Sequence, residues 1–498
     1  MQLNLTTVFI GVAIAAAVLT LLVGFVKKGH KSWLLTFLQN FAGVFFIFSG
    51  MVKAVDPLGT AYKLEQYFAE FESTFEGTWF SFISPIFPFF NDYAVQLSVF
   101  VIIVEIVVGL MLVMGMKTKF TSWAFLAMVG FFTFLTGFTY LTGYVPSGVN
   151  FFSFGSWADY DANNMKVTDC GCFGDFLKLE PKVSFFKDLI LLIPAFFFVF
   201  KHKDMHQLFT KKIRWAIAGA TTVGLLIYCL SNYVWDLPHN DFRPFRKGAN
   251  VGEQYEAELN SMANVQILAW KLQNKNEPAK VIELSHDVYM KEFKNYPKTE
   301  WTVVDQVKSE PEIPSTKISE FEVVSIDDYD ASDVFLEQEG YKIMIVSHKM
   351  KGDVIGTATR TVIDTITVVD TIQVEDAKLE EVVRTRQEAV QTQVEYNDYG
   401  WDEAWLADYI DKIKPIALSA KEDEVPVGIV AGGAGPELLN EFRIKTGLNV
   451  DYYTADDILL KTIIRSNPGV VLWKDGVILD KWHISKLPSW EEMKKTHF

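Results

Sequence analysis

Residues 7–26 read TVFIGVAIAAAVLTLLVGFV, twenty consecutive residues without a charged side chain. About 20 apolar residues in a helix cross the ~30 Å hydrocarbon core of a bilayer. Five further apolar runs follow before residue 236, over 33–52, 93–115, 121–143, 185–200 and 214–234. The sequence therefore predicts a membrane α-helical bundle of six transmembrane helices. The first run has no basic stretch before it, so we interpret it as a retained helix rather than a cleaved signal.

The rest of the chain has a different composition. Half of all residues are hydrophobic, yet 61 Asp and Glu outnumber 46 Lys and Arg to give a formal net charge of −15. These two properties are segregated, because the region from Trp235 onward lacks any run long enough to span. Phosphate binding needs clustered Lys and Arg. The acidic half has no such cluster, so we expect no nucleic-acid partner.

Basic residues in the short connections predict the orientation, because Lys and Arg near helix ends stay on the cytoplasmic side. They gather after the first, third and fifth runs: Lys27, Lys28, Lys31, Lys117, Lys119, Lys201, Lys203, Lys211, Lys212 and Arg214. This pattern places both termini and the connections 53–92 and 144–184 on the outer side. We therefore expect a bacterial inner-membrane protein, in contact with lipid, whose C-terminal domain is periplasmic.

The stretch TDCGCFGD, residues 168–175, holds two of the three cysteines in the outer connection before the fifth run. Disulfides persist in such an oxidising compartment. A disulfide between Cys170 and Cys172 would close a small, strained ring that is easily reduced. Redox exchange and structural fastening of the loop are both open interpretations. Metal binding is the weakest, because no CxxC or HxxxH spacing accompanies the pair, and we expect no metal.

The third cysteine, Cys229, falls near the outer end of the sixth run. It is either a buried apolar residue or a resolving thiol for the pair in the loop.

Glu105 interrupts the third apolar run, and an ionisable group at that depth is costly unless it is neutral or has a partner. It is either a proton relay or quinol-headgroup contact, or a protonated carboxyl bonded to Gln39 or Asn40. Lys53 and Asp56 stand where the second run ends. A terminal Lys extends cheaply to the interface, so interface anchoring competes with a site near the CGC loop.

Three stretches together carry a family resemblance. FAGVFFIFSGMVKAVDPLGTAYKLEQYF at 41–68, VEIVVGLMLVMG at 104–115 and CGCFGD at 170–175 resemble the DoxX/MauE family of redox-associated membrane proteins. Its members are linked to quinone-coupled sulfur oxidation or to maturation of a disulfide-rich dehydrogenase. The resemblance implies a redox association and a quinone as the candidate cofactor. The candidate residues are Cys170, Cys172 and Glu105 for catalysis, and Lys53 and Asp56 for cofactor binding.

Beyond the sixth run, alternating short strands and helices predict an α/β region. RSNPGVVLWKDGVI at 465–478 is similar to the thioredoxin-like fold, in which a cis proline, here Pro468, precedes a hairpin strand. Redox thioredoxins carry CxxC after the first core strand, where this chain has Ser347, His348, Lys349 and Met350. Without a thiolate there is no nucleophile for exchange. We therefore expect a domain that binds a periplasmic partner, with His348 either solvated or a ligand contact.

The residue patterns divide the chain into five parts. They are an extra N-terminal helix (1–32), the DoxX/MauE-like four-helix unit (33–202), a cytoplasmic loop with the sixth helix (203–234), a β-rich periplasmic region (235–314) and the thioredoxin-like domain (315–498).

An insertion at about 351–400 interrupts the thioredoxin-like domain. Residues 359–374 alternate as in a strand, and 375–396 have helical character. The insertion is either an arm that pairs with a partner or a hairpin packed on its own domain.

Two functions follow from these observations. One is an envelope redox protein that acts through the CGC loop. The other is a non-catalytic scaffold or accessory subunit of an envelope complex. The sequence leaves open whether the protein is an enzyme.

Overall fold

The computed structural model describes residues 4–27, 31–167, 171–277, 280–370 and 384–498. The chain divides into two compact units. Unit 1 contains residues 1–249 together with two later segments, Thr462–Ser466 and Asp480–Lys486. Unit 2 contains the remainder.

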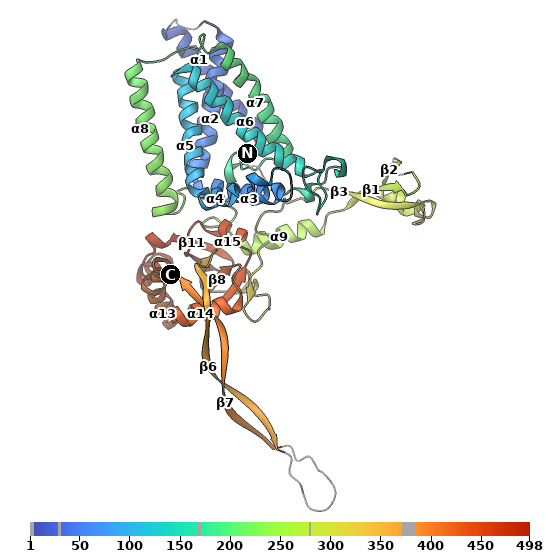
Figure 1. Cartoon of the computed structure of the whole chain (residues 1–498), viewed down its shortest axis with the longest axis vertical. Coiled ribbons are helices and arrows are strands. Elements are labelled where there is room, and N and C mark those ends of the chain that lie inside the picture. Colours follow the sequence, from blue (N-terminus) through green and yellow to red (C-terminus); the bar gives the residue numbers. More distant parts are fainter. Residues whose placement is uncertain (1–3, 28–30, 168–170, 278–279, 371–383) are drawn as a thin grey trace, which may run out of the picture. The chain divides into compact units, whose positions relative to one another are not determined.

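Six long apolar helices form the body of unit 1 (Figure 1). They are α1 (Leu5–Lys27), α2 (Trp33–Val55), α5 (Ala94–Met114), α6 (Thr118–Thr142), α7 (Pro181–Lys201) and α8 (Lys211–Leu230). All six have the length and composition to cross a membrane, and six is the number predicted and the number found among the described residues. The fifth begins at Pro181, four residues before the predicted start, because proline suits the first position of a helix.

Two shorter helices lie between α2 and α5, and the sequence patterns did not reveal the first. They are α3 (Pro57–Phe75) and α4 (Ile86–Asp92). Asp56 starts α3 by accepting a hydrogen bond from the backbone N–H of Gly59 at 3.1 Å. Between α6 and α7 the described chain has only single helical turns, at Phe154–Ser156, Ala162–Asn164 and Gly174–Phe176.

Helices α2 and α5 approach closely at glycines. A Cβ atom on Gly43 would lie 2.7 Å from the carbonyl oxygen of Gly109, and the reverse distance is also 2.7 Å. About two turns further along α2, a Cβ on Gly50 would lie 2.4 Å from the Ile106 side chain. Small residues allow such backbone approach between membrane helices. The two helices are therefore closely packed at Gly43, Gly50 and Gly109.

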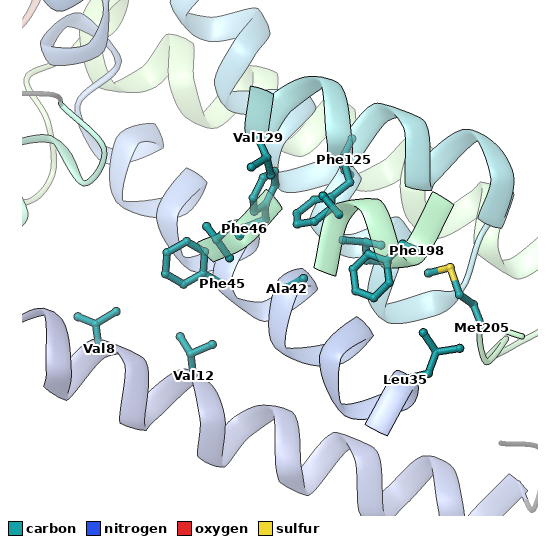
Figure 2. Close-up of a cluster of buried hydrophobic side chains, with 14 of the residues drawn as sticks. Val8, Val12, Leu35, Ala42, Phe45, Phe46, Phe125, Val129, Phe198 and Met205 are labelled. Atoms are coloured by element: carbon teal, nitrogen blue, oxygen red, sulfur yellow. The ribbon is translucent and has the colours of Figure 1, made fainter. Parts of the chain in front are cut away.

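Aromatic side chains fill the core of unit 1 (Figure 2). Val8 and Val12 point from α1 toward α2, which contributes Phe46. The ring centroid of Phe46 lies 4.6 Å from that of Phe125 on α6, which in turn lies 5.7 Å from Phe198 on α7. With Val108 and Leu112 of α5, this cluster joins five of the six long helices.

Unit 2 begins with a helix and a small antiparallel sheet of order β2-β1-β3. The elements are α9 (Val251–Ala263), β1 (Ile267–Asn274), β2 (Val281–Ser285), α10 (His286–Glu292) and β3 (Trp301–Lys308). These three strands lie within residues 235–314, the region that the sequence predicted to be β-rich.

A six-stranded sheet of order β11-β10-β5-β8-β9-β4 follows. Its strands are β4 (Val324–Ser325), β5 (Tyr341–Ser347), β8 (Val427–Gly432), β9 (Asp451–Ala455), β10 (Gly469–Lys474) and β11 (Val477–His483). The connecting helices are α11 (Asp333–Leu336), α12 (Glu403–Ala407), a π-helical segment (Asp408–Ile413), α13 (Lys414–Glu422), α14 (Pro436–Thr446), α15 (Asp457–Ile463) and α16 (Trp490–His497).

The pairing in this sheet is mixed. β5 runs parallel to β8 and β8 runs parallel to β9, whereas β10 is antiparallel to β5. The Asn467–Pro468 peptide bond is cis and immediately precedes β10, as the sequence predicted. The predicted α/β character is confirmed.

The insertion is a two-stranded antiparallel ribbon of β6 (Gly352–Asp370) and β7 (Arg384–Trp401), which extends away from the six-stranded sheet (Figure 1). The predicted helix over 375–396 is wrong from residue 384 onward, and 371–383 lie outside the described residues. β6 is rich in β-branched residues and needs a strand partner for its backbone groups. Pairing along the whole length of β7 supplies that partner, and this outweighs the helical charge pattern.

Candidate functional site

In the described part of unit 1, two ion pairs have both side chains buried. The Nζ of Lys53 on α2 lies 2.7 Å from the Oε2 of Glu105 on α5, and their side chains are 3% and 2% exposed. On α7, the Nζ of Lys187 lies 2.5 Å from the Oδ1 of Asp188, and these side chains are 6% and 3% exposed. Thr136 on α6 donates a hydrogen bond to Asp188 at 3.0 Å. Four helices thus contribute polar groups to an apolar interior.

The partner of Glu105 differs from the predicted one. Gln39 donates to the backbone oxygen of Leu112, and Asn40 donates to Thr20, so neither amide bonds to Glu105. The interpretation of a carboxyl group held by these amides is wrong.

Interface anchoring is also wrong for Lys53. Its ammonium points inward and lies 4.4 Å from the centre of the Phe132 ring as well as bonding to Glu105. A lone buried carboxylate is far more costly than a buried pair, so the lysine is drawn to it rather than to the interface.

Cys172 lies close to the two buried ion pairs. Ser49 on α2, one helical turn before Lys53, donates a hydrogen bond to the Cys172 carbonyl oxygen at 3.1 Å. The Lys187 ammonium lies 5.9 Å from the ring of the next residue, Phe173, and 5.7 Å from the ring of Phe45. Cys172 is therefore attached to α2 beside both ion pairs.

The charges near Cys172 act on its thiol in opposite directions. Burial raises the pKa of the Cys172 thiol, the Lys187 ammonium opposes that rise, and the Asp188 carboxylate adds to it. A raised pKa leaves the thiol protonated at neutral pH, so the thiolate forms only when something stabilises it.

The other two cysteines are Cys170 and Cys229. Cys170 lies outside the described residues. Cys229 is fully buried on α8 and packs against a cluster that includes Ala54, Ile102 and Ile106. Among the described residues, neither Cys172 nor Cys229 is in a disulfide. The surroundings of Cys229 favour the apolar interpretation over a resolving thiol.

Asp56 has a separate set of partners within unit 1. Besides starting α3, it accepts two hydrogen bonds from the Nε of Arg465, at 3.1 and 2.9 Å. The same guanidinium donates to Asp175, in the CGCFGD stretch, at 3.2 Å. Asp56 is thus linked to the CGC loop through Arg465 rather than to the Lys53–Glu105 pair.

Sequence reasoning missed Lys187, Asp188 and Thr136. The signal was present in FFKDLILL at 185–192, where adjacent opposite charges enter an apolar run. The predicted span began at 185 and placed these charges at its edge. With Pro181 as the first helical residue they lie in the second turn and face inward.

The C-terminal candidates lie in unit 2. Ser347 ends β5, and its hydroxyl donates a hydrogen bond to the Oδ1 of Asn467 at 3.2 Å, next to the cis proline. His348 is half-buried in the turn that follows. In the described part of the chain, no group of three or more His, Cys, Asp or Glu is arranged to hold a metal ion.

No family model, curated protein or solved structure matches this chain.

Proposed function

We propose that this protein is a membrane-embedded redox protein that passes electrons from protein thiols to a quinone through Cys170 and Cys172. The observation that carries this proposal is the position of Cys172. Its backbone is bound to α2 beside two buried ion pairs drawn from three helices. Ionisable groups in membrane helices are costly to keep, and their retention points to a function by default.

The proposed reaction has two balanced steps. A client dithiol attacks the Cys170–Cys172 disulfide through a mixed disulfide, so that the client leaves oxidised and both cysteines are reduced. Re-forming the Cys170–Cys172 bond then releases two electrons and two protons. A bound quinone would accept both and leave as the quinol.

Lys187 and Asp188 act on the charge of the Cys172 thiolate. Breaking the disulfide produces a thiolate, and the Lys187 ammonium lowers the cost of that charge on Cys172. Asp188 holds this ammonium in place, since their hydrogen bond is 2.5 Å long. Glu105 and Asp188 are the buried carboxylates that could receive the released protons.

The donors near this site suit a quinone, whose two carbonyl oxygens only accept hydrogen bonds. Lys53 has three N–H donors and uses one on Glu105. Ser184, on the same face of α7 as Asp188, is fully buried, and among the described residues its hydroxyl has no hydrogen-bond partner. Asp56 offers only acceptors, and its oxygens hold Arg465. We therefore assign quinone binding to Lys53 and Ser184 and leave Asp56 out.

The DoxX/MauE resemblance and the basic short connections support an inner-membrane location with the CGC loop in the periplasm. In the same proposal, the C-terminal domain is thioredoxin-like and binds the client without reacting. The mixed sheet and the cis Asn467–Pro468 bond support the fold, and the absence of cysteine after Cys229 supports a binding role.

The test follows the thiol state of the full-length protein in lipid nanodiscs. Alkylation and intact-mass spectrometry count the free thiols before and after a water-soluble quinone or a reduced dithiol peptide is added. We expect two thiols to be lost with quinone and regained with the dithiol. Cys172→Ser should abolish the cycle and Cys229→Ser should leave it intact. A thiol count that stays constant under all conditions would refute the redox function.

The β6–β7 ribbon favours a second candidate function, a non-catalytic scaffold, because it extends away from the six-stranded sheet as an arm for a partner protein. The base of the ribbon is attached to its own unit, because Asn397 on β7 makes two hydrogen bonds of 2.9 Å to Glu437 on α14. The stacked rings of Trp401 and Trp405 add to this attachment. A constant thiol count together with co-purification of a partner that depends on the ribbon would establish this function instead.

A further inference from the structure

A basic pocket opens in unit 1 where α5 ends and α6 and α8 begin. Its volume is about 650 Å³. Four cationic residues line it: Lys117, Lys119, Lys211 and Arg214. The other described lining residues are Met116, Thr118, Phe120, Trp123, Gln207 and Trp215, and none of these is acidic.

The Arg214 side chain is held in a fixed place at this pocket. Its Nη1 donates to the carbonyl oxygen of Gly115 at 2.7 Å, and both terminal nitrogens donate to Gln207. Neither acceptor carries a formal charge, so the guanidinium keeps its full positive charge. Lys119 and Lys211 are exposed and can move toward a ligand.

Two helix N-termini add to the positive potential of the pocket. Thr118 starts α6, which has 25 residues, and Lys211 starts α8, which has 20. Backbone N–H groups in the first turn of a helix lack intrahelical partners, and the helix dipole places partial positive charge there. The cationic side chains and the helix ends therefore favour an anion in the same place.

Exposed aromatic rings distinguish a lipid from a small soluble anion. Phe120, Trp123 and Trp215 line the pocket and are 64%, 54% and 54% exposed. Tryptophan at the end of a membrane helix sits at headgroup depth, where its ring contacts acyl chains. A free phosphate would use the cations but not these apolar rings.

We propose that this basic pocket binds the headgroup of an anionic phospholipid, with Lys119 and Lys211 on the phosphate and the aromatic rings against the acyl chains. Basic pockets between membrane helices bind anionic headgroups by this chemistry. The site is independent of the thiol chemistry, since none of its residues contributes to either buried ion pair.

The experiment is native mass spectrometry of the full-length protein in detergent, titrated with phosphatidylglycerol or with phosphatidylcholine of the same acyl chains. We expect one tight phosphatidylglycerol site and no comparable phosphatidylcholine site. The double variant Lys119→Gln, Lys211→Gln should bind phosphatidylglycerol about thirtyfold more weakly, since each basic residue near an anionic surface contributes about fivefold.

The control is the double variant Lys201→Gln, Lys203→Gln, which removes the same charge from the end of α7 and the connection that follows it, at two residues that do not line the pocket. It should bind phosphatidylglycerol like the unmodified protein. Equal losses in both double variants would mean a diffuse charge effect and would overturn the proposal.

Competition with a soluble phosphate ester distinguishes binding of a lipid from binding of free phosphate. Glycerol 3-phosphate should compete only weakly, because it lacks acyl chains; equal affinity for it would make the pocket a soluble-anion site and refute the proposal. Brominated phosphatidylglycerol provides an independent reading. It should quench tryptophan fluorescence, and the loss of that quenching in Trp123→Phe, Trp215→Phe would place the lipid at the pocket.

Discussion

Lys53 and Glu105 face each other at 2.7 Å from two different membrane helices, 52 positions apart in the chain, and neither side chain reaches the surface. Each of these charges is tolerable at its depth only because the other is present. The pair links α2 and α5 a short distance from their glycine contact, and it lies beside the point where the CGC loop is attached to α2.

The first prediction concerns this pair. Lys53→Met should lower the free energy of unfolding by about 3–5 kcal/mol, because it leaves a buried carboxylate without a partner. Replacing both residues, as Lys53→Met with Glu105→Leu, should recover most of the loss. Thermal unfolding in one fixed detergent measures the change. Lys31→Met is the control, since its ion pair with Asp204 is exposed and should contribute little.

The outcome that would contradict this prediction is equal thermal stability of Lys53→Met and Lys31→Met. The double replacement being less stable than Lys53→Met alone would also contradict it.

The second prediction concerns the pH dependence of Cys172. Only the thiolate reacts with an alkylating agent, and an ordinary thiol titrates near pH 8.5. Burial raises the pKa of Cys172, so the alkylation rate should still be increasing above that pH. Lys187→Met should move the profile to higher pH by removing a cation, and Asp188→Asn should move it to lower pH by removing an anion. The rates are measured with Cys170 and Cys229 replaced by Ser.

The direction of these two shifts is the decisive result. If Lys187→Met and Asp188→Asn moved the profile the same way, the effect would be structural loosening of the loop rather than the field of the charges.

The third prediction tests the closeness of α2 and α5. Gly43→Ala should destabilise the bundle by about 1–3 kcal/mol, because its new methyl group would overlap the Gly109 carbonyl oxygen and one helix would have to move. Gly130→Ala on α6 is the matched control. A Cβ there meets nothing within 4 Å, so stability should be unchanged or slightly higher. Equal effects of the two changes on the midpoint of thermal unfolding would argue against the close contact.

The fourth prediction concerns the β6–β7 ribbon. Replacing residues 357–397 by Asn-Gly should leave unit 2 folded, because this dipeptide closes a two-residue hairpin between the paired residues Gly356 and Asp398 and the Trp401–Trp405 contact remains. Circular dichroism and size-exclusion chromatography of the full-length variant check the fold. A partner protein that binds the ribbon should co-purify with the unmodified protein but not with this variant. Aggregation of the variant would show that the ribbon stabilises its own unit.

The sequence predicted the six long helices and the α/β character of the C-terminal region, because both depend on local patterns. A run of about 20 apolar residues forms an α-helix in lipid, because every backbone N–H and C=O must then be bonded within the segment. The strand-and-helix alternation around Pro468 is equally local. The cysteine pair and Glu105 could be singled out because charged or reactive residues are rare in such surroundings.

Tertiary structure decided which polar groups meet. At the end of its helix, Lys53 has the same local pattern as an interface anchor, and only the fold brings Glu105 within 2.7 Å of it. Lys187 and Asp188 looked like the edge of a span until α7 was found to begin at Pro181. Residues 384–396 carry a helical charge pattern, yet pairing with β6 makes them a strand. In each case the deciding energy comes from a partner distant in the chain, which no local pattern contains.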